Sequence, residues 1–146
     1  MKVVLDRLGD MSWMQVAVRP AKPLAFGVVG GTPVFGLPGN PVSSMVSFEL
    51  FARPGLRRMA GHDDSDLDRL RVRAVAGEDL PRRPDGKVHL VRVTTSIRDD
   101  GRFVVRSAGG QGSHQLSAMA AADALAVLPD GPGVEAGGEV EVLLLR

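Results

Sequence analysis

The chain has 146 residues, no cysteine and a formal net charge of +1, with 44% hydrophobic and 24% charged side chains. This composition is typical of a folded globular protein, and it leaves no thiol for a disulfide framework or a thiolate metal site. The small net charge argues against nucleic-acid binding by bulk charge, and no run of about 18 apolar residues predicts a membrane-spanning helix.

The first thirty residues mix helical and strand patterns. Apolar residues over 2–8 recur at helical spacing, with Gly9 as a plausible C-terminal cap, and this segment reads as the tail of a helix. Residues 14–19 alternate between apolar and other side chains and predict a strand. The apolar segments on either side of Gly30-Gly31 predict two strands joined by a tight hairpin turn.

A sharp turn, Leu-Pro-Gly-Asn-Pro, then leads into a second helix, which we predict over 41–52 and expect to end before Pro54-Gly55. Asn40 is a good N-cap, and Pro41 stands where the first helical residue needs no N–H group. Gly39 lets the backbone take a conformation that a side chain would block.

This turn is a candidate anion site because the free N–H groups and the dipole of a helix start both favour negative charge. The N–H groups of Val42, Ser43 and Ser44 are expected to be free, with the two serine hydroxyls facing the turn. The alternative is a well-capped junction without a ligand, and the helix start alone does not decide between the two.

The stretch Gly-His-Asp-Asp-Ser-Asp-Leu-Asp at 61–68 is polar and acidic, and we place a domain boundary there, between 1–62 and 63–146. Its alternating aspartates resemble a calcium loop, but an EF-hand loop starting at Asp64 would need Gly at Arg69 and Glu at Val75. A solvated linker therefore fits better.

The second half predicts short strands separated by turns, which suggests a small barrel or sandwich. An alanine-rich stretch over 117–122 predicts a helix, and residues 98–102 predict a hairpin turn. The fold class is therefore α+β, a short mixed segment followed by a small β domain. The predicted strands cover residues 70–77, 88–97, 102–107, 124–129 and 139–145.

Candidate chemistry outside the turn consists mainly of cations and a glycine-rich loop. Arg19 and Lys22 lie three residues apart, each followed by proline, so both could face one anion, although an exposed basic loop is the alternative. The loop 108–116 holds three glycines, whose N–H groups could form an anion-binding nest, and also Ser113 and His114. His114 is a weak acid–base candidate, and no histidine pair has metal-ligand spacing.

Two long stretches resemble a known family. "VAVRPAKPLAFG…GTPVFGLPGNPVSSMVSFELFARP" and "GGQGSHQLSAMAAADALAVLP…VEAGGEVEVLLL" look like motifs of the molybdopterin molybdenumtransferase family, which includes bacterial MoeA and the E domain of gephyrin. The resemblance covers essentially the whole chain, with the motifs in order. It implies that residues 1–62 are the C-terminal part of an α/β molybdopterin-binding domain and that 63–146 are the family's C-terminal β-barrel.

The resemblance also implies an activity. Enzymes of this family bind adenylated molybdopterin and molybdate, cleave the adenylyl group with Mg²⁺, and release molybdenum cofactor and AMP. They act as homodimers in the cytoplasm, so neither nucleic acid nor a membrane is an expected partner. The Mg²⁺ ligands are expected in an N-terminal part that this chain lacks, so we predict little turnover from the chain alone.

Carried over by position, Lys22 matches a family lysine near molybdate and substrate phosphate, and Arg19 stands where the family commonly has another lysine. Ala21 stands where glycine is frequent. Ser43 matches a serine of the same pocket, and Gly39 and Asn40 belong to the same segment. Arg92 and Ser113 match an anion-binding arginine and serine of the barrel. The alternative function is a non-catalytic scaffold or interaction module derived from this family.

Overall fold

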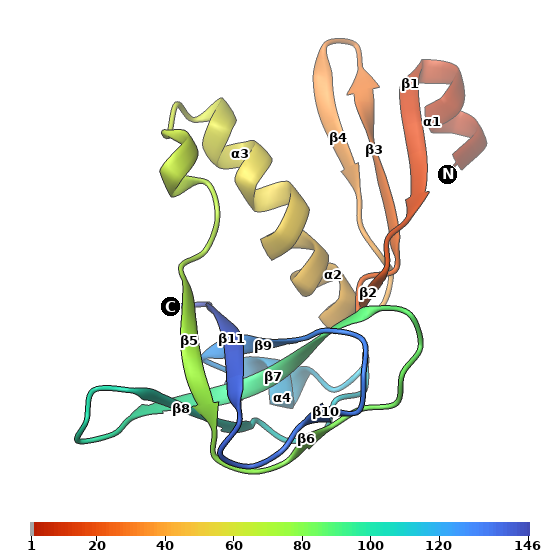
Figure 1. Ribbon diagram of the computed structural model, residues 1–146. Coiled ribbons are helices and arrows are strands. Elements are labelled where there is room, and N and C mark those ends of the chain that lie inside the picture. The colour runs from red at the N-terminus through yellow and green to blue at the C-terminus, as the bar shows by residue number, and fades with distance from the viewer. Residues whose placement is uncertain (1) are drawn as a thin grey trace.

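The computed structural model describes residues 2–146, and Figure 1 shows an N-terminal half that stands on a C-terminal β-barrel. An antiparallel sheet in the order β1-β3-β4 and a long bent helix rise from the barrel, with a narrow junction at β2. The sheet and the helix before it comprise α1 (Lys2–Leu8), β1 (Gly9–Gln15), β3 (Pro23–Val29) and β4 (Thr32–Gly36). The predicted N-terminal helix is confirmed, although Gly9 begins β1 instead of capping it.

The single strand predicted over 14–19 is wrong, because this alternating segment is shared between two sheets. β1 ends at Gln15, where it pairs with Pro23 of β3. The chain then crosses to the barrel, where β2 (Val18–Arg19) pairs in parallel with the start of β7 (Val88–Ile97). Local alternation indicates extended backbone but cannot indicate which partner strand each residue finds.

The predicted hairpin is confirmed. β3 and β4 pair antiparallel, with Val29 opposite Thr32. Gly30 and Gly31 join them with φ values of 55° and 81°. Two successive positive φ angles are the geometry of the tight turns that match the twist of a hairpin, and glycine adopts them without a Cβ clash.

The second helix begins at Pro41, as predicted, but it runs beyond Pro54-Gly55 to Met59. It consists of α2 (Pro41–Ser47), a π-helical turn over Phe48–Ala52 and α3 (Arg53–Met59). A proline inside an α-helix removes one hydrogen bond and crowds the carbonyl four residues earlier. The π turn directly before Pro54 widens the helix, and the Arg53 N–H bonds the Phe48 carbonyl, so the helix continues.

Gly55 allows this helix to pack closely on the hairpin. A Cβ at Gly55 would lie 2.9 Å from the Phe35 ring of β4. Past Met59 the chain turns through an exposed acidic linker, where Arg57 pairs with Asp66 and Arg58 pairs with Asp64. The domain division at 62 and 63 stays a prediction.

The C-terminal half is a closed five-stranded barrel, which confirms the α+β class and the predicted small β domain. Each strand that we predicted after residue 70 is present, and so is the helix, α4 (Leu116–Ala121). The short strands β6 (Leu80–Pro81) and β10 (Gly133–Val134) were not predicted. In the order of the ring, the barrel consists of β7, β8 (Phe103–Ser107), β5 (Arg71–Ala76), β11 (Glu139–Leu144) and β9 (Ala124–Leu128), which pairs again with β7.

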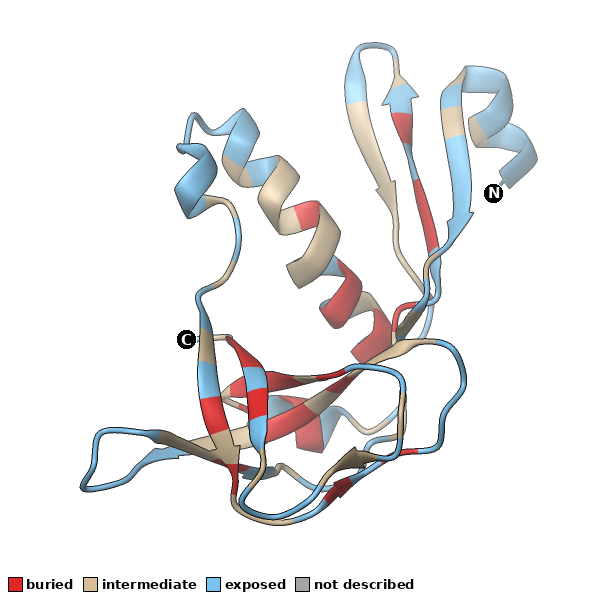
Figure 2. Cartoon of the chain, viewed as in Figure 1, coloured by how far each residue is buried: buried red, intermediate tan, exposed pale blue. Residues whose placement is uncertain are grey.

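Two hydrophobic cores hold the molecule together. The first fills the barrel and includes the fully buried Val93, Val105 and Leu128. The second lies at the junction, where Val42 and Val46 of α2 pack with residues of the barrel strands and α4. In Figure 2 the buried residues are concentrated in the barrel and in the first turns of α2, whereas α1 and most of β1 are exposed. Across residues 2–146, no helix has the length and apolarity needed to cross a bilayer.

Candidate functional site

The candidate site forms where β2 and β7 bring two distant loops together. Arg19 pairs in register with His89, and the Val88 N–H donates to the Ala17 carbonyl at 2.9 Å. After β2 the chain reverses through a cis Arg19–Pro20 peptide and through Ala21, whose φ is 108°. The loop that carries Lys22 therefore lies beside the loop that ends at Lys87.

A cleft of about 420 Å³ opens between these loops, the start of α2 and the glycine-rich loop. The structure brings most of the predicted residues together in it, although they come from three separate parts of the sequence. Those that line the cleft are Arg19, Lys22, Asn40, Ser43 and Ser113. Gly39 is not among the residues that line it.

Three further polar residues line the cleft, and sequence reasoning missed them: Asp85, Lys87 and Gln111. The turn Arg-Pro-Asp-Gly-Lys at 83–87 reads only as a polar loop, because its relevance depends on the pairing of β2 with β7. With the cations Arg19, Lys22 and Lys87 and the carboxylate Asp85, the lining has a formal net charge of +2. Such a cleft favours anions.

The start of α2 differs from the expectation of free N–H groups. The Val42 N–H donates to the Ser113 carbonyl at 3.2 Å, and the Ser44 N–H donates to the Asn40 carbonyl at 2.9 Å. Asn40 occupies the N-cap position, but its side chain makes no capping bond and donates instead to Ser113 Oγ at 3.3 Å. The glycine-rich loop thus occupies part of the helix start, and the polar side chains carry the remaining capacity for a ligand.

Arg92 does not line the cleft as expected, because it is fully buried beneath the glycine-rich loop. Its Nη2 donates to the carbonyls of Gly110 and Gly112 at 2.8 and 3.3 Å, and its backbone N–H donates to Gln111 Oε1 at 2.9 Å. Within the described residues, its Nε and Nη1 have no hydrogen-bond partner. Burial lowers the pKa of this guanidinium. The sequence signal for the burial of Arg92 is its position two residues after Leu90 on β7, because alternate residues of a strand face the same side and Leu90 is buried.

Asp85 is the centre of the cationic cluster. Its Oδ1 accepts from Arg82 Nη2 at 3.0 Å and faces His89 Nε2 at 3.1 Å. Its Oδ2 lies 3.1 Å from Lys87 Nζ and 3.7 Å from Arg19 Nη1. Partial burial raises the pKa of Asp85, but hydrogen bonds from Lys87 and His89 and their charges outweigh it, and the pKa falls to about 2. The carboxylate is therefore ionised at neutral pH.

The remaining histidines do not contribute to this site. His114 is exposed on the glycine-rich loop and does not line the cleft, and His62 pairs with Asp66 in the linker. Among residues 2–146 no group of three or more His, Asp or Glu side chains is placed to hold a metal ion.

Comparison with known proteins covers both halves of the chain. Residues 1–58 match the family model "Probable molybdopterin binding domain", and residues 73–145 match "MoeA C-terminal region (domain IV)". Over 138 residues, 94% of this chain, it is 32% identical to the molybdopterin molybdenumtransferase of Haemophilus influenzae. Over 139 residues, 93% of the chain, it is 38% identical to molybdopterin molybdenumtransferase 2 of Mycobacterium tuberculosis.

A solved structure supports the same relationship. The molybdopterin biosynthesis MoeA protein of Pyrococcus horikoshii superimposes on 99% of this chain with a TM-score of 0.74 and 27% identity. The chain spans about a third of these relatives: 34% of the Haemophilus protein, 33% of the Mycobacterium protein and 34% of the Pyrococcus protein. By the match over residues 73–145, the chain belongs to the molybdopterin molybdenumtransferase (MoeA) family, of which it carries the C-terminal region.

Proposed function

We propose that this chain supplies the oxyanion-binding cleft of a molybdopterin molybdenumtransferase, which inserts molybdate into adenylated molybdopterin and releases AMP. The site residues in this proposal are Lys22, Arg19, Ser43 and Ser113, with Arg92 beneath them. Both substrates carry oxyanions, molybdate itself and the phosphates of the adenylated pterin. The cleft would therefore bind one of these groups and stabilise its charge.

One observation carries the proposal: a fully buried arginine with unsatisfied N–H groups lies under a loop of a net positive cleft. Arg92 is 0% exposed, and its Nε and Nη1 have no partner within residues 2–146. An unpaired buried charge is unfavourable, so a negative charge nearby would offset its cost. Arg92 does not line the cleft, but its Nη2 donates to the Gly112 carbonyl, next to Ser113, so its charge adds to the positive potential that an oxyanion in the cleft would meet.

The chemistry expected of these residues is charge stabilisation and not proton transfer. Arg19 and Lys22 supply positive charge, and the Asn40 amide and the hydroxyls of Ser43 and Ser113 are hydrogen-bond donors at the same cleft. Fixed donors in a partly dehydrated cleft favour the negative charge that develops on the oxyanions during transfer.

The rest of the reaction depends on parts outside this chain. We propose that Mg²⁺ assists cleavage of the adenylyl group and is bound by residues of an N-terminal part of the protein. Working as a homodimer in the cytoplasm is likewise part of the proposal. A single-turnover assay for AMP release should detect little or no product from the 146 residues alone.

Calorimetric titration of molybdate tests the cleft directly. Lys22 is exposed, so Lys22→Ala should leave the fold intact and weaken molybdate binding by about tenfold, the effect of one removed charge a few ångströms away. Lys2→Ala is the matched control, because Lys2 of α1 lies over the Trp13 ring of β1 and does not line the cleft. Equal affinity in the wild type and Lys22→Ala would remove Lys22 from the site. The alternative, a non-catalytic interaction module, predicts no molybdate binding in either protein.

A further inference from the structure

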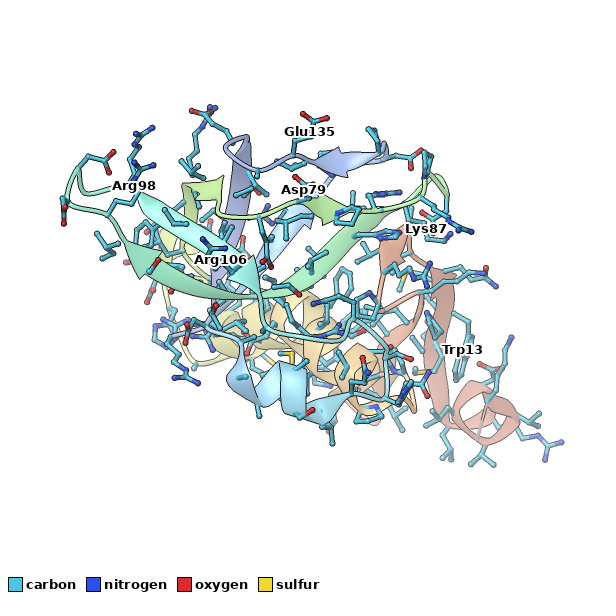
Figure 3. The ribbon with its side chains drawn as sticks, turned by 90° about the horizontal axis from the view of Figure 1, so that it is seen from below. Trp13, Asp79, Lys87, Arg98, Arg106 and Glu135 are labelled. Carbon is cyan, nitrogen blue, oxygen red and sulfur yellow. The ribbon has the colours of Figure 1, made fainter. Side chains whose placement is uncertain are left out.

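The cleft contains a negative charge that the proposed ligand would have to face. Asp85 lines the cleft together with Arg19 and Lys87, and it contacts both of these cations. The carboxylate therefore pairs with cations that an oxyanion would otherwise use. Figure 3 shows Lys87 at one end of the barrel and Arg98 at the other, so the cluster is local to the cleft end of β7.

Asp85 cannot easily leave when a ligand arrives, because Arg82 anchors its loop. The Arg82 side chain is 1% exposed, and its Nη2 donates to Asp85 Oδ1 and to Asp130 Oδ1. Its Nη1 donates to the carbonyls of Lys87, Leu128 and Pro129. A buried guanidinium tied to the end of β9 thus fixes the loop that carries both Asp85 and Lys87.

We infer that Asp85 is a built-in competitor of the ligand: its carboxylate neutralises Arg19 and Lys87 and lowers the affinity of the cleft for oxyanions. This inference rests on the proposed function of the cleft. In this role Asp85 sets how tightly the cleft binds an anion. Moderate affinity suits a site that must transfer its bound oxyanion.

The opposite reading is that Asp85 strengthens binding by holding the cations in position, and the geometry decides between the two. Lys87 Nζ also donates to the backbone carbonyl of residue 85 at 3.0 Å, a bond that does not need the carboxylate. Arg19 is 67% exposed in its side chain and 3.7 Å from Asp85, so the carboxylate holds it only loosely. Removing the Asp85 charge therefore relieves repulsion between the carboxylate and the ligand, and it disturbs the positions of Lys87 and Arg19 only slightly.

Asp85→Asn tests this inference because it keeps the shape of the side chain and removes its charge. Arg82 keeps its bonds to Asp130 and to the three carbonyls, so the loop should stay in place. The probes are molybdate and perrhenate, two tetrahedral oxyanions with charges of −2 and −1. Because a Coulomb energy scales with ligand charge, we expect molybdate to bind about tenfold tighter and perrhenate about threefold tighter than to the wild type. Both gains should shrink as salt is added.

The control is Asp100→Asn, which removes another carboxylate with a lowered pKa, in the exposed turn at the far end of β7. Asp100→Asn should leave the affinities for molybdate and perrhenate unchanged. Melting curves should show that all variants are folded. If Asp85→Asn does not fold, Asp85→Ala takes its place. If Lys22→Ala loses molybdate while Asp85→Asn binds equally or more weakly, the inference is wrong and the proposed function stands. If neither the wild type nor Asp85→Asn binds molybdate, the proposed function fails, and this inference fails with it.

Discussion

The barrel and the N-terminal half differ in how completely they bury their apolar side chains. The barrel strands close into a ring, so their inward side chains cover one another, and Val93, Val105 and Leu128 are fully buried. The sheet β1-β3-β4 stays open, and α1 buries none of its residues. Most of the large exposed hydrophobic side chains precede residue 60: Val3, Val4, Leu8, Trp13, Met14, Phe26, Val28, Met45, Phe48, Leu56 and Met59.

This difference shows which region depends on its surroundings. A closed barrel has its own core and no free sheet edge, which are the requirements for independent stability. The N-terminal half shares a core with the barrel only near α2 and leaves its distal part with unburied apolar surface. We therefore expect substitutions in the barrel to control the free energy of unfolding and substitutions in α1 to have little effect.

The largest expected effect separates the two regions with the same substitution. Leu128→Ala removes a fully buried side chain of the barrel and should lower the free energy of unfolding by about 3 kcal/mol. Leu8→Ala removes a side chain that is 60% exposed and should change it by less than about 0.5 kcal/mol. Urea denaturation of both variants measures the contrast, and equal losses would mean that the N-terminal half is as well packed as the barrel.

The second prediction concerns acid. The folded-state pKa of Asp85 is about 2, below its ordinary value of 3.8, so the folded chain holds this proton less tightly than the unfolded chain. The stabilisation from Asp85 is therefore complete above about pH 4, and it is lost as the pH falls towards 2. Melting temperatures between pH 5 and 2 should fall less steeply in Asp85→Asn than in the wild type. Parallel curves would show that the Asp85 cluster does not stabilise the junction between β2 and β7.

The contrast also explains what the sequence could predict. Barrel strands such as 88–97 are recognisable because period-two alternation and turn residues act locally. The split of 14–19 between two sheets and the continuation of the helix past Pro54 depend on partners far away in the chain. Tertiary contacts decide those features, and local patterns do not contain them.

The candidate site follows the same rule. Arg19, Lys22 and Ser43 were predictable because prolines and a helix start mark their segments, and these features are local. Asp85 and Lys87 reach the cleft only through the parallel pairing of β2 with β7, which no local pattern specifies. The burial of Arg92 depends equally on a distant segment, the glycine-rich loop, whose Gly110 and Gly112 carbonyls accept from its guanidinium.

The smallest expected effect lies at the junction itself, in Ala21→Gly. Ala21 is buried but has a φ of 108°, a conformation that typically costs a residue other than glycine about 1–3 kcal/mol. Glycine would relieve this strain, but it loses a buried methyl worth about 0.8 kcal/mol and adds about 0.5–1 kcal/mol of unfolded-chain entropy. These terms nearly cancel, so we expect a change in the free energy of unfolding within about 1 kcal/mol of zero.

Ala126→Gly in β9 is the matched comparison, because Ala126 is fully buried and is not among the residues with positive φ. It loses the same methyl and gains the same chain entropy without relieving strain, so it should destabilise the chain by about 1.3–1.8 kcal/mol. The difference between the two variants, measured by urea denaturation, is the strain stored at Ala21. If both variants lose the same free energy, the loop that carries Lys22 is relaxed, and the junction holds its shape without opposing any strain.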